Sequence, residues 1–244
     1  MSRPVLLVLG GSRGIGAATA TLAASRGYDV AIAYKSNAQA AQGVADAVEA
    51  AGAKAVLVQG DLAQEADIER AFVAAEQLGP VTNLVHSAGI TGKNSRLDAV
   101  ETSTIRDVLD INTFGALLTL RSAVRRMSTK HGGKGGSIVM LSSMAADLGG
   151  TNEYVWYAAA KGAVNSMTVG LAREVAKEGI RINAVSPGAI DTDIHEPGRL
   201  DRVMPFMPMG RAGKVEEVAE TILFLLSDAA SYITGTIVNV SGGR

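Results

Sequence analysis

Cysteine is absent from this chain of 244 residues, which excludes disulfide bonds, thiolate metal sites and cysteine nucleophiles. Histidine is scarce: His86, His131 and His195 are too scattered to suggest a metal site. Long hydrophobic runs are also missing, since the apolar run at residues 5–9 is too short for a membrane span or a signal-peptide core. We therefore expect a cytoplasmic protein without a metal and without a membrane anchor.

Charge of either sign is not in excess, because 23 Lys and Arg residues face 24 Asp and Glu residues. A net charge of −1 favours neither nucleic acid nor an anionic membrane as a partner. Hydrophobic residues make up 47% of the chain, which is typical of a compact globular protein. No linker rich in proline or serine interrupts the chain, so we expect a single domain over residues 1–244.

Short Val- and Ile-rich runs alternate with Ala-rich segments along the chain. The runs predict strands at residues 5–9, 30–34, 55–58, 84–86, 137–141, 180–185 and 236–240. The segments between them predict helices at residues 16–26, 38–51, 64–78, 105–126, 157–177 and 215–226. This alternation indicates an α/β, Rossmann-like doubly wound fold with a mostly parallel seven-stranded sheet and helices on both faces. Residues 191–213 hold three of the six prolines and predict a lid over a pocket.

A glycine-rich loop joins the first predicted strand to the first predicted helix. It consists of Gly10, Gly11, Ser12, Arg13, Gly14, Ile15 and Gly16. Glycine permits the tight turn and lets the backbone approach a pyrophosphate, and the helix N-terminus then offers unpaired N–H groups to it. The motif alone also fits an ordinary turn, but its place between strand and helix predicts a dinucleotide site.

The end of the second predicted strand bears on the choice of cofactor. An NAD site usually has an acidic residue there for the ribose 2′-hydroxyl, whereas this chain has Tyr34, Lys35 and Ser36. Lys35 and Arg13 are cations available to a 2′-phosphate, which a carboxylate would repel. The alternative is that Lys35 is a solvated loop charge. The electrostatics favour NADP(H).

Tyr157 and Lys161 are four residues apart on one predicted helix and therefore share a face. A neighbouring ammonium would stabilise the phenolate and lower the pKa of Tyr157, which would make proton exchange practical. Ser143 follows a predicted strand and could hold a substrate oxygen beside the phenol. Each feature alone also fits a chance arrangement.

These motifs together resemble the short-chain dehydrogenase/reductase family over the whole chain, with glucose dehydrogenases and 3-oxoacyl-acyl-carrier-protein reductases as broad neighbours. The resemblance implies that Tyr157 exchanges the proton and that Ser143 orients the carbonyl. It implies that Lys161 tunes Tyr157 and binds the nicotinamide ribose, and that Asn112 anchors a water linked to Lys161. The remaining cofactor contacts that it implies are Asp61 and Leu62 beside the adenine, Ser87, Ala88 and Gly89 after the fourth strand, and Pro187, Gly188, Ile190 and Thr192 at the nicotinamide.

Two departures from the family pattern concern the substrate side. His86 and Ser87 stand where the family usually has two asparagines, and the stretch between Ser143 and Tyr157 is one residue longer than the common spacing. The extra length places Glu153 or Tyr154 at the rim of the substrate site. His195 and Glu196 fall in the lid and could touch the substrate, but we favour a solvated surface role for both. The acidic residues of the lid slightly disfavour an anionic substrate.

The predicted function is NADP(H)-dependent, reversible reduction of a small carbonyl compound. One alternative is an NAD-linked alcohol or sugar dehydrogenase, and another is a non-catalytic NADP(H) sensor. The resemblance also implies a homodimer or homotetramer assembled through the predicted helices 105–126 and 157–177. The sequence does not identify the substrate.

Overall fold

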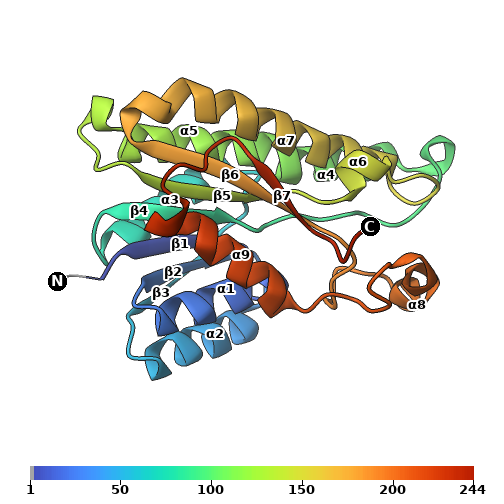
Figure 1. Cartoon of the computed structure of the whole chain (residues 1–244), viewed down its shortest axis with the longest axis horizontal. Coiled ribbons are helices and arrows are strands. Elements are labelled where there is room, and N and C mark those ends of the chain that lie inside the picture. The colour runs from blue at the N-terminus through green and yellow to red at the C-terminus, as the bar shows by residue number, and fades with distance from the viewer. Residues whose placement is uncertain (1–2) are drawn as a thin grey trace.

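The computed structural model describes residues 3–244 and has a single parallel sheet at its centre. The strands of the sheet are β1 (Val5–Leu9), β2 (Asp29–Tyr34), β3 (Ala55–Gln59), β4 (Val81–His86), β5 (Gly136–Leu141), β6 (Ile180–Pro187) and β7 (Ile237–Val240). They lie side by side in the order β3-β2-β1-β4-β5-β6-β7, and every pair is parallel. This confirms the predicted seven-stranded, Rossmann-like sheet (Figure 1).

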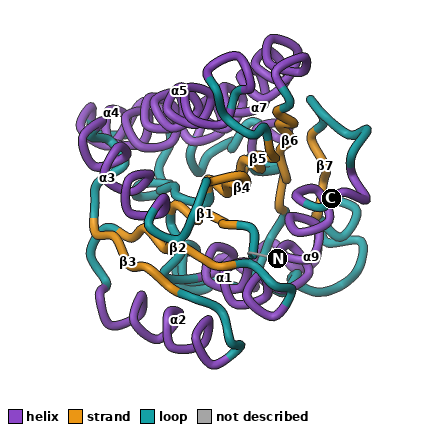
Figure 2. The backbone as a smooth tube through the Cα atoms, turned by 90° about the vertical axis from the view of Figure 1, so that its left-hand side faces the viewer, coloured by secondary structure: helices purple, strands orange, loops and turns teal. Residues whose placement is uncertain are grey.

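Helices cover both faces of the sheet (Figures 1 and 2). One face packs against α1 (Gly14–Ser25), α2 (Ala38–Ala50) and α9 (Val215–Leu226). The other packs against α3 (Glu65–Glu76), α5 (Gly115–Met127) and α7 (Val155–Val175). Since both faces are covered, the strands need no polar alternation, which explains their continuous apolar sequences.

Strand β1 shows how the sequence produces the two cores. All five of its residues are buried. Leu6 and Val8 join the cluster beneath α1, α2 and α9, while Leu7 and Leu9 join the cluster beneath α3, α5 and α7. Successive side chains of a strand point to opposite faces, so one apolar run serves both layers.

The helix predicted at residues 105–126 is interrupted in the structure. It consists of α4 (Thr102–Leu109), a π-helical turn (Asp110–Phe114) and α5. The wider turn carries Asn112, and Gly115 lies so close to Leu62 that a Cβ there would be 2.3 Å from the Leu62 carbonyl oxygen. Short π-helical segments in longer helices are frequent at functional sites. A short helix that was not predicted, α6 (Ala145–Leu148), precedes α7.

The sheet order reverses between β1 and β4, which is where doubly wound folds form their ligand crevice. The lid (residues 191–213) lies beside this crevice and contains the short helix α8 (Arg199–Val203). A parallel bridge between Ile190 and Gly213 closes the base of the lid. Among residues 3–244, no helix combines the length and the apolar character needed to cross a bilayer.

Candidate active site

The glycine loop between β1 and α1 is shaped by close backbone contacts. Gly10 has a φ of +81°, and a Cβ there would lie 2.6 Å from the Ala88 nitrogen. A Cβ on Gly16 would lie 2.1 Å from the Gly10 carbonyl oxygen. Neither position has room for a side chain. Arg13 precedes α1 without a side-chain cap, which leaves the helix N-terminus open for a phosphate group.

A cavity of about 520 Å³ extends from this loop along the ends of β2 and β4. Most of the predicted cofactor residues line it, namely Gly10, Ser12, Arg13, Gly14, Ile15, Tyr34, Lys35, Ser36, Asp61, Leu62, Ser87, Ala88, Gly89 and Thr192. Gly16 does not line it, because Gly16 packs behind the loop. Because the glycines of this loop have no Cβ, the phosphates of a dinucleotide cofactor could approach its backbone closely.

The two cations predicted to meet a 2′-phosphate are paired with carboxylates. Lys35 Nζ lies 2.7 Å from Asp61 Oδ2, and Arg13 forms an ion pair with Asp193 of the lid. Burial raises the pKa of Asp61, but hydrogen bonds from Lys35 and the Ala63 amide outweigh it and hold the pKa below its usual value. Both ion pairs are largely exposed, so water screens them and an incoming anion can replace either carboxylate.

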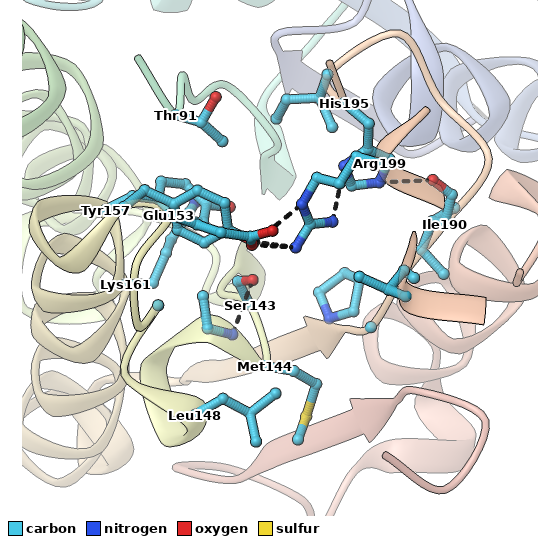
Figure 3. Close-up of a pocket in the computed structure, with 18 of the residues that line it drawn as sticks. Thr91, Ser143, Met144, Leu148, Glu153, Tyr157, Lys161, Ile190, His195 and Arg199 are labelled. Carbon is cyan, nitrogen blue, oxygen red and sulfur yellow. Dashed lines mark hydrogen bonds and ion pairs between the residues drawn. The ribbon is translucent and has the colours of Figure 1, made fainter. Parts of the chain in front are cut away.

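A second cavity of about 600 Å³ adjoins the first and shares Ile15, Ser87, Gly89 and Thr192 with it. Ser143, Tyr157 and Lys161 line this second cavity, together with Pro187, Gly188 and Ile190 (Figure 3). Tyr157 and Lys161 come from the first turns of α7, and Ser143 comes from the loop after β5. The structure thus brings three of the four predicted catalytic residues into one cavity beside the predicted nucleotide site.

The fourth residue, Asn112, is buried outside both cavities. Its Oδ1 accepts a hydrogen bond from the Ile90 amide at 3.0 Å, and its Nδ2 donates to the Ile90 carbonyl at 2.7 Å. A Cβ on the neighbouring Gly89 would lie 2.8 Å from Asn112 Oδ1. Asn112 therefore fixes the segment that follows β4. Gly89 of this segment lines both cavities.

The electrostatics of Tyr157 differ from the prediction. Burial raises its pKa, and neither its hydrogen bond with Ser143 nor the charge of Arg199 fully offsets this effect. Lys161 Nζ lies 5.7 Å from the centre of the Tyr157 ring and donates to the Leu141 carbonyl at 2.6 Å. In this structure the ammonium is directed at a carbonyl and the net pKa of Tyr157 is raised; that Lys161 tunes Tyr157 stays a prediction.

Lys161 itself is strongly affected by its surroundings. Burial lowers its pKa to about 8. Burial and the charge of Lys161 also lower the pKa of His86 to about 3, so His86 is neutral. Neither ring nitrogen of His86 has a hydrogen-bond partner among residues 3–244. Whether His86 replaces the family asparagine stays an open prediction.

The far side of the second cavity contains a network that the sequence analysis missed in part. Glu153 and Tyr154 lie at the rim as predicted, and they meet Arg199, which was not predicted. Glu196 is exposed as expected, but His195 is not solvated as expected, since it packs against Arg199 and Ile190. No local sequence pattern indicates Arg199, because its role depends on the contact between α8 and the residues just before α7.

Trp156 and His131 both lie outside the two cavities. Trp156 is buried away from the cavity and donates to the Thr91 carbonyl at 2.8 Å, and His131 is exposed.

Comparison with known proteins agrees with this geometry. A family model described as enoyl-(acyl carrier protein) reductase matches residues 10–244. The chain belongs to the short-chain dehydrogenase/reductase family. It is 47% identical to the uncharacterized oxidoreductase YgfF of Escherichia coli, covering 98% of this chain and 99% of that protein. It is 36% identical to a 3-oxoacyl-[acyl-carrier-protein] reductase of Synechocystis, covering 100% and 97%.

A solved structure supports the same assignment. The short chain dehydrogenase of Burkholderia cenocepacia in complex with NADP is 34% identical, has a TM-score of 0.91, and is matched over 99% of this chain and 97% of that one. The protein is therefore an oxidoreductase of this family, and the predicted family resemblance is confirmed.

Proposed function

We propose that this member of the family is an NADP(H)-dependent enzyme that reversibly reduces a small carbonyl compound to an alcohol. We also propose that residues 1–244 act as one dinucleotide-binding and catalytic unit. The observation that carries the proposal is the position of Tyr157, Ser143 and Lys161 in one cavity that adjoins the cavity of the glycine loop. One cavity has the glycine loop at its end, and the other has room for a substrate.

A nicotinamide cofactor bound in the first cavity would supply the hydride chemistry at the carbonyl carbon, and the residues of this chain would bind, orient and protonate the oxygen. Tyr157 keeps its proton at neutral pH because burial raises its pKa, so it can donate that proton to the substrate oxygen. Ser143 Oγ accepts from the Ala145 amide at 3.1 Å, and the Ser143 hydroxyl lies beside Tyr157, so both hydroxyls can turn to the same substrate oxygen. Lys161 places a positive charge beside the ring.

The preference for NADP(H) over NAD(H) rests on the charges at the ribose end of the first cavity. Lys35 and Arg13 line it, and β2 itself ends without a carboxylate. The Asp61 and Asp193 carboxylates in this cavity are paired with these two cations, and both pairs are largely exposed. The family relative with bound NADP supports the same choice. A direct comparison of the kcat/KM values for NADPH and NADH tests this preference, and substitution of Lys35 by alanine should reduce it. An NAD-linked enzyme would instead favour NADH.

The decisive test of catalysis is Tyr157→Phe, which removes the hydroxyl and little else. We expect kcat for carbonyl reduction to fall about 1,000-fold, within the range typical of lost acid–base catalysis. NADPH binding, followed by cofactor fluorescence, should persist. Tyr232→Phe is the matched control, because Tyr232 is fully exposed. Unchanged turnover in Tyr157→Phe would contradict the proposed mechanism, and absence of turnover in the unsubstituted protein would favour a non-catalytic sensor.

We also propose a homodimer or homotetramer. Large apolar side chains are exposed on α4, the π-helical turn and α5, including Leu109, Phe114 and Leu117. Such an apolar surface is typical of a subunit interface. Light scattering during size-exclusion chromatography tests it, and Leu117→Glu should shift the protein toward the monomer. The cytoplasmic location stays a prediction.

A further inference from the structure

An ion pair crosses the second cavity from the segment just before α7 to the lid. Arg199, the first residue of α8, donates from Nε and Nη2 to Glu153 Oε2 at 3.2 Å and 2.9 Å. Glu153 lies just before α7, which carries Tyr157. Figure 3 shows the Arg199 side chain in the middle of the cavity, with Glu153 and Tyr157 on one side and Ile190 on the other.

Two further side chains hold the guanidinium in place. Nη2 donates to the Tyr154 hydroxyl, and Nη1 lies 3.2 Å from His195 Nδ1. His195 Nε2 lies 2.9 Å from the Ile190 carbonyl oxygen, which can only accept, so Nε2 carries the proton and Nδ1 accepts from Arg199. Burial and the charge of Arg199 lower the pKa of His195, which agrees with a neutral ring.

This network leaves one donor and one acceptor without a partner. A guanidinium has five N–H groups, and the contacts above use four of them, so one N–H of Nη1 remains. Both Arg199 bonds to Glu153 reach Oε2, so the lone pairs of Oε1 remain available. Even with the Tyr154 hydroxyl directed at this carboxylate, Glu153 retains acceptor capacity.

The reacting centre is close to this pair. The rings of Tyr154 and Tyr157 pack edge to face with their centres 5.4 Å apart, and the Arg199 guanidinium carbon lies 5.2 Å from the centre of the Tyr154 ring. The side chain of Arg199 is only 8% exposed, whereas that of Glu153 is 29% exposed. A substrate whose carbonyl meets Tyr157 therefore places its neighbouring atoms near a desolvated guanidinium and an accessible carboxylate.

We propose that Glu153 and Arg199 form a subsite that recognises a hydroxyl group of the substrate, so that the enzyme prefers hydroxylated carbonyl compounds, such as hydroxyketones and sugars. This inference rests on the proposed carbonyl reduction. A hydroxyl both donates and accepts, which matches the free carboxylate oxygen and the free N–H. A plain ketone leaves both protein groups unpaired when it excludes water from them, and that costs binding free energy.

The same geometry disfavours an anionic substrate. Glu153 neutralises Arg199, so a substrate carboxylate in the subsite would face the Glu153 carboxylate. Arg202 and Arg244 also line the cavity, but neither belongs to the subsite, and Arg202 is exposed, so water screens its charge. The subsite therefore selects for hydrogen-bonding capacity instead of net charge.

The test uses substrates that share a carbon skeleton. Hydroxyacetone, acetone and pyruvate form one set, and 4-hydroxy-2-butanone, 2-butanone and acetoacetate form another with a longer reach. We expect kcat/KM with NADPH to be at least about 10-fold higher for the hydroxylated member of one set. Because hydroxylation also changes carbonyl reactivity, the ratio must be compared between proteins.

Glu153→Gln should lower the hydroxylated-to-plain ratio by about 10-fold, mainly through KM, because the amide lacks the charge that strengthens the hydrogen bond. Arg199→Lys should lower the ratio as well, since an ammonium lacks the fixed fork of donors. Asp201→Asn is the control: Asp201 is an exposed acid on the same short helix α8 and should keep the ratio. Circular dichroism and NADPH binding verify that each variant is folded.

A second measurement does not depend on turnover. In Tyr157→Phe protein with NADPH, saturation-transfer NMR should show 1,2-propanediol binding more strongly than 2-propanol, which lacks only the hydroxyl that the subsite recognises, and Glu153→Gln should remove the difference. Turnover of all carbonyls with ratios that Glu153→Gln leaves unchanged would overturn the subsite. Preference for the carboxylate members would overturn it too. Failure to reduce any carbonyl would instead overturn the proposed function.

Discussion

The two ends of the cleft are built in different ways. At the nucleotide end, backbone atoms form the walls, and Gly10 and Gly16 let main chains approach closer than any side chain permits. At the substrate end, a network of side chains that includes Arg199, Glu153 and His195 connects the lid to the catalytic helix. The sheet holds the backbone walls in place, and these walls suit the dinucleotide cofactor that members of the family share. Side-chain networks can change with single substitutions, so this end can adapt to a particular substrate.

The most damaging change at the nucleotide end should be Gly16→Ala. Its Cβ would meet the Gly10 carbonyl oxygen at 2.1 Å, so the loop must move out of its phosphate-binding shape. We expect NADPH affinity to fall at least about 100-fold, because loop geometry places the phosphate contacts. Fluorescence titration measures this.

Gly43→Ala is the matched control, because a Cβ there meets nothing within 4 Å on α2. It should leave NADPH affinity unchanged and stabilise the protein by about 0.5–1 kcal/mol, because alanine favours the helix. Equal losses of affinity in both variants would contradict the view that backbone approach builds this end.

At the substrate end, Arg199→Met should destabilise the lid contact by about 2 kcal/mol. The change removes hydrogen bonds to a carboxylate, but Glu153 is partly exposed and can be rehydrated, which moderates the cost. Urea denaturation measures the free energy of unfolding, and limited proteolysis of the lid detects local opening. Unaltered NADPH affinity would show that the two ends are independent, whereas a large loss would show that the lid also shapes the nucleotide end.

The junction between the two ends should respond to pH. The pKa of Lys161 is lowered to about 8, so the ammonium is present below this pH and is lost above it. The pKa of Tyr157 is raised, so its proton remains over the same range. We expect kcat/KM for reduction to fall above pH 8, by about 10-fold per pH unit if the charge is essential.

The pH–rate profile of Lys161→Arg provides the comparison, since a guanidinium stays charged throughout. Its profile should lack the decline near pH 8. A decline at the same pH in both proteins would mean that another group titrates.

The smallest effect should come from Asp193→Asn, where the lid touches the nucleotide end. The substitution frees Arg13 from its carboxylate partner and removes a negative charge near the predicted 2′-phosphate position. Because the pair is exposed, we expect only a 2- to 3-fold gain in NADPH affinity, on the order of a surface ion pair. NADH affinity is the internal control and should not change; an equal gain for both cofactors would contradict a role for Arg13 at the 2′-phosphate.

The sequence determined the sheet, the glycine loop and the positions of Tyr157 and Lys161 on one helix, because these depend on local periodicity and on residue types that only a few backbone shapes accept. Tertiary structure decided what lies around them. The ammonium of Lys161 reaches the Leu141 carbonyl, the Asn112 side chain is bound to Ile90 across a π-helical turn, and Arg199 meets Glu153 across 46 positions of sequence. Such contacts depend on where separate segments pack and how much water they exclude, which no local pattern records.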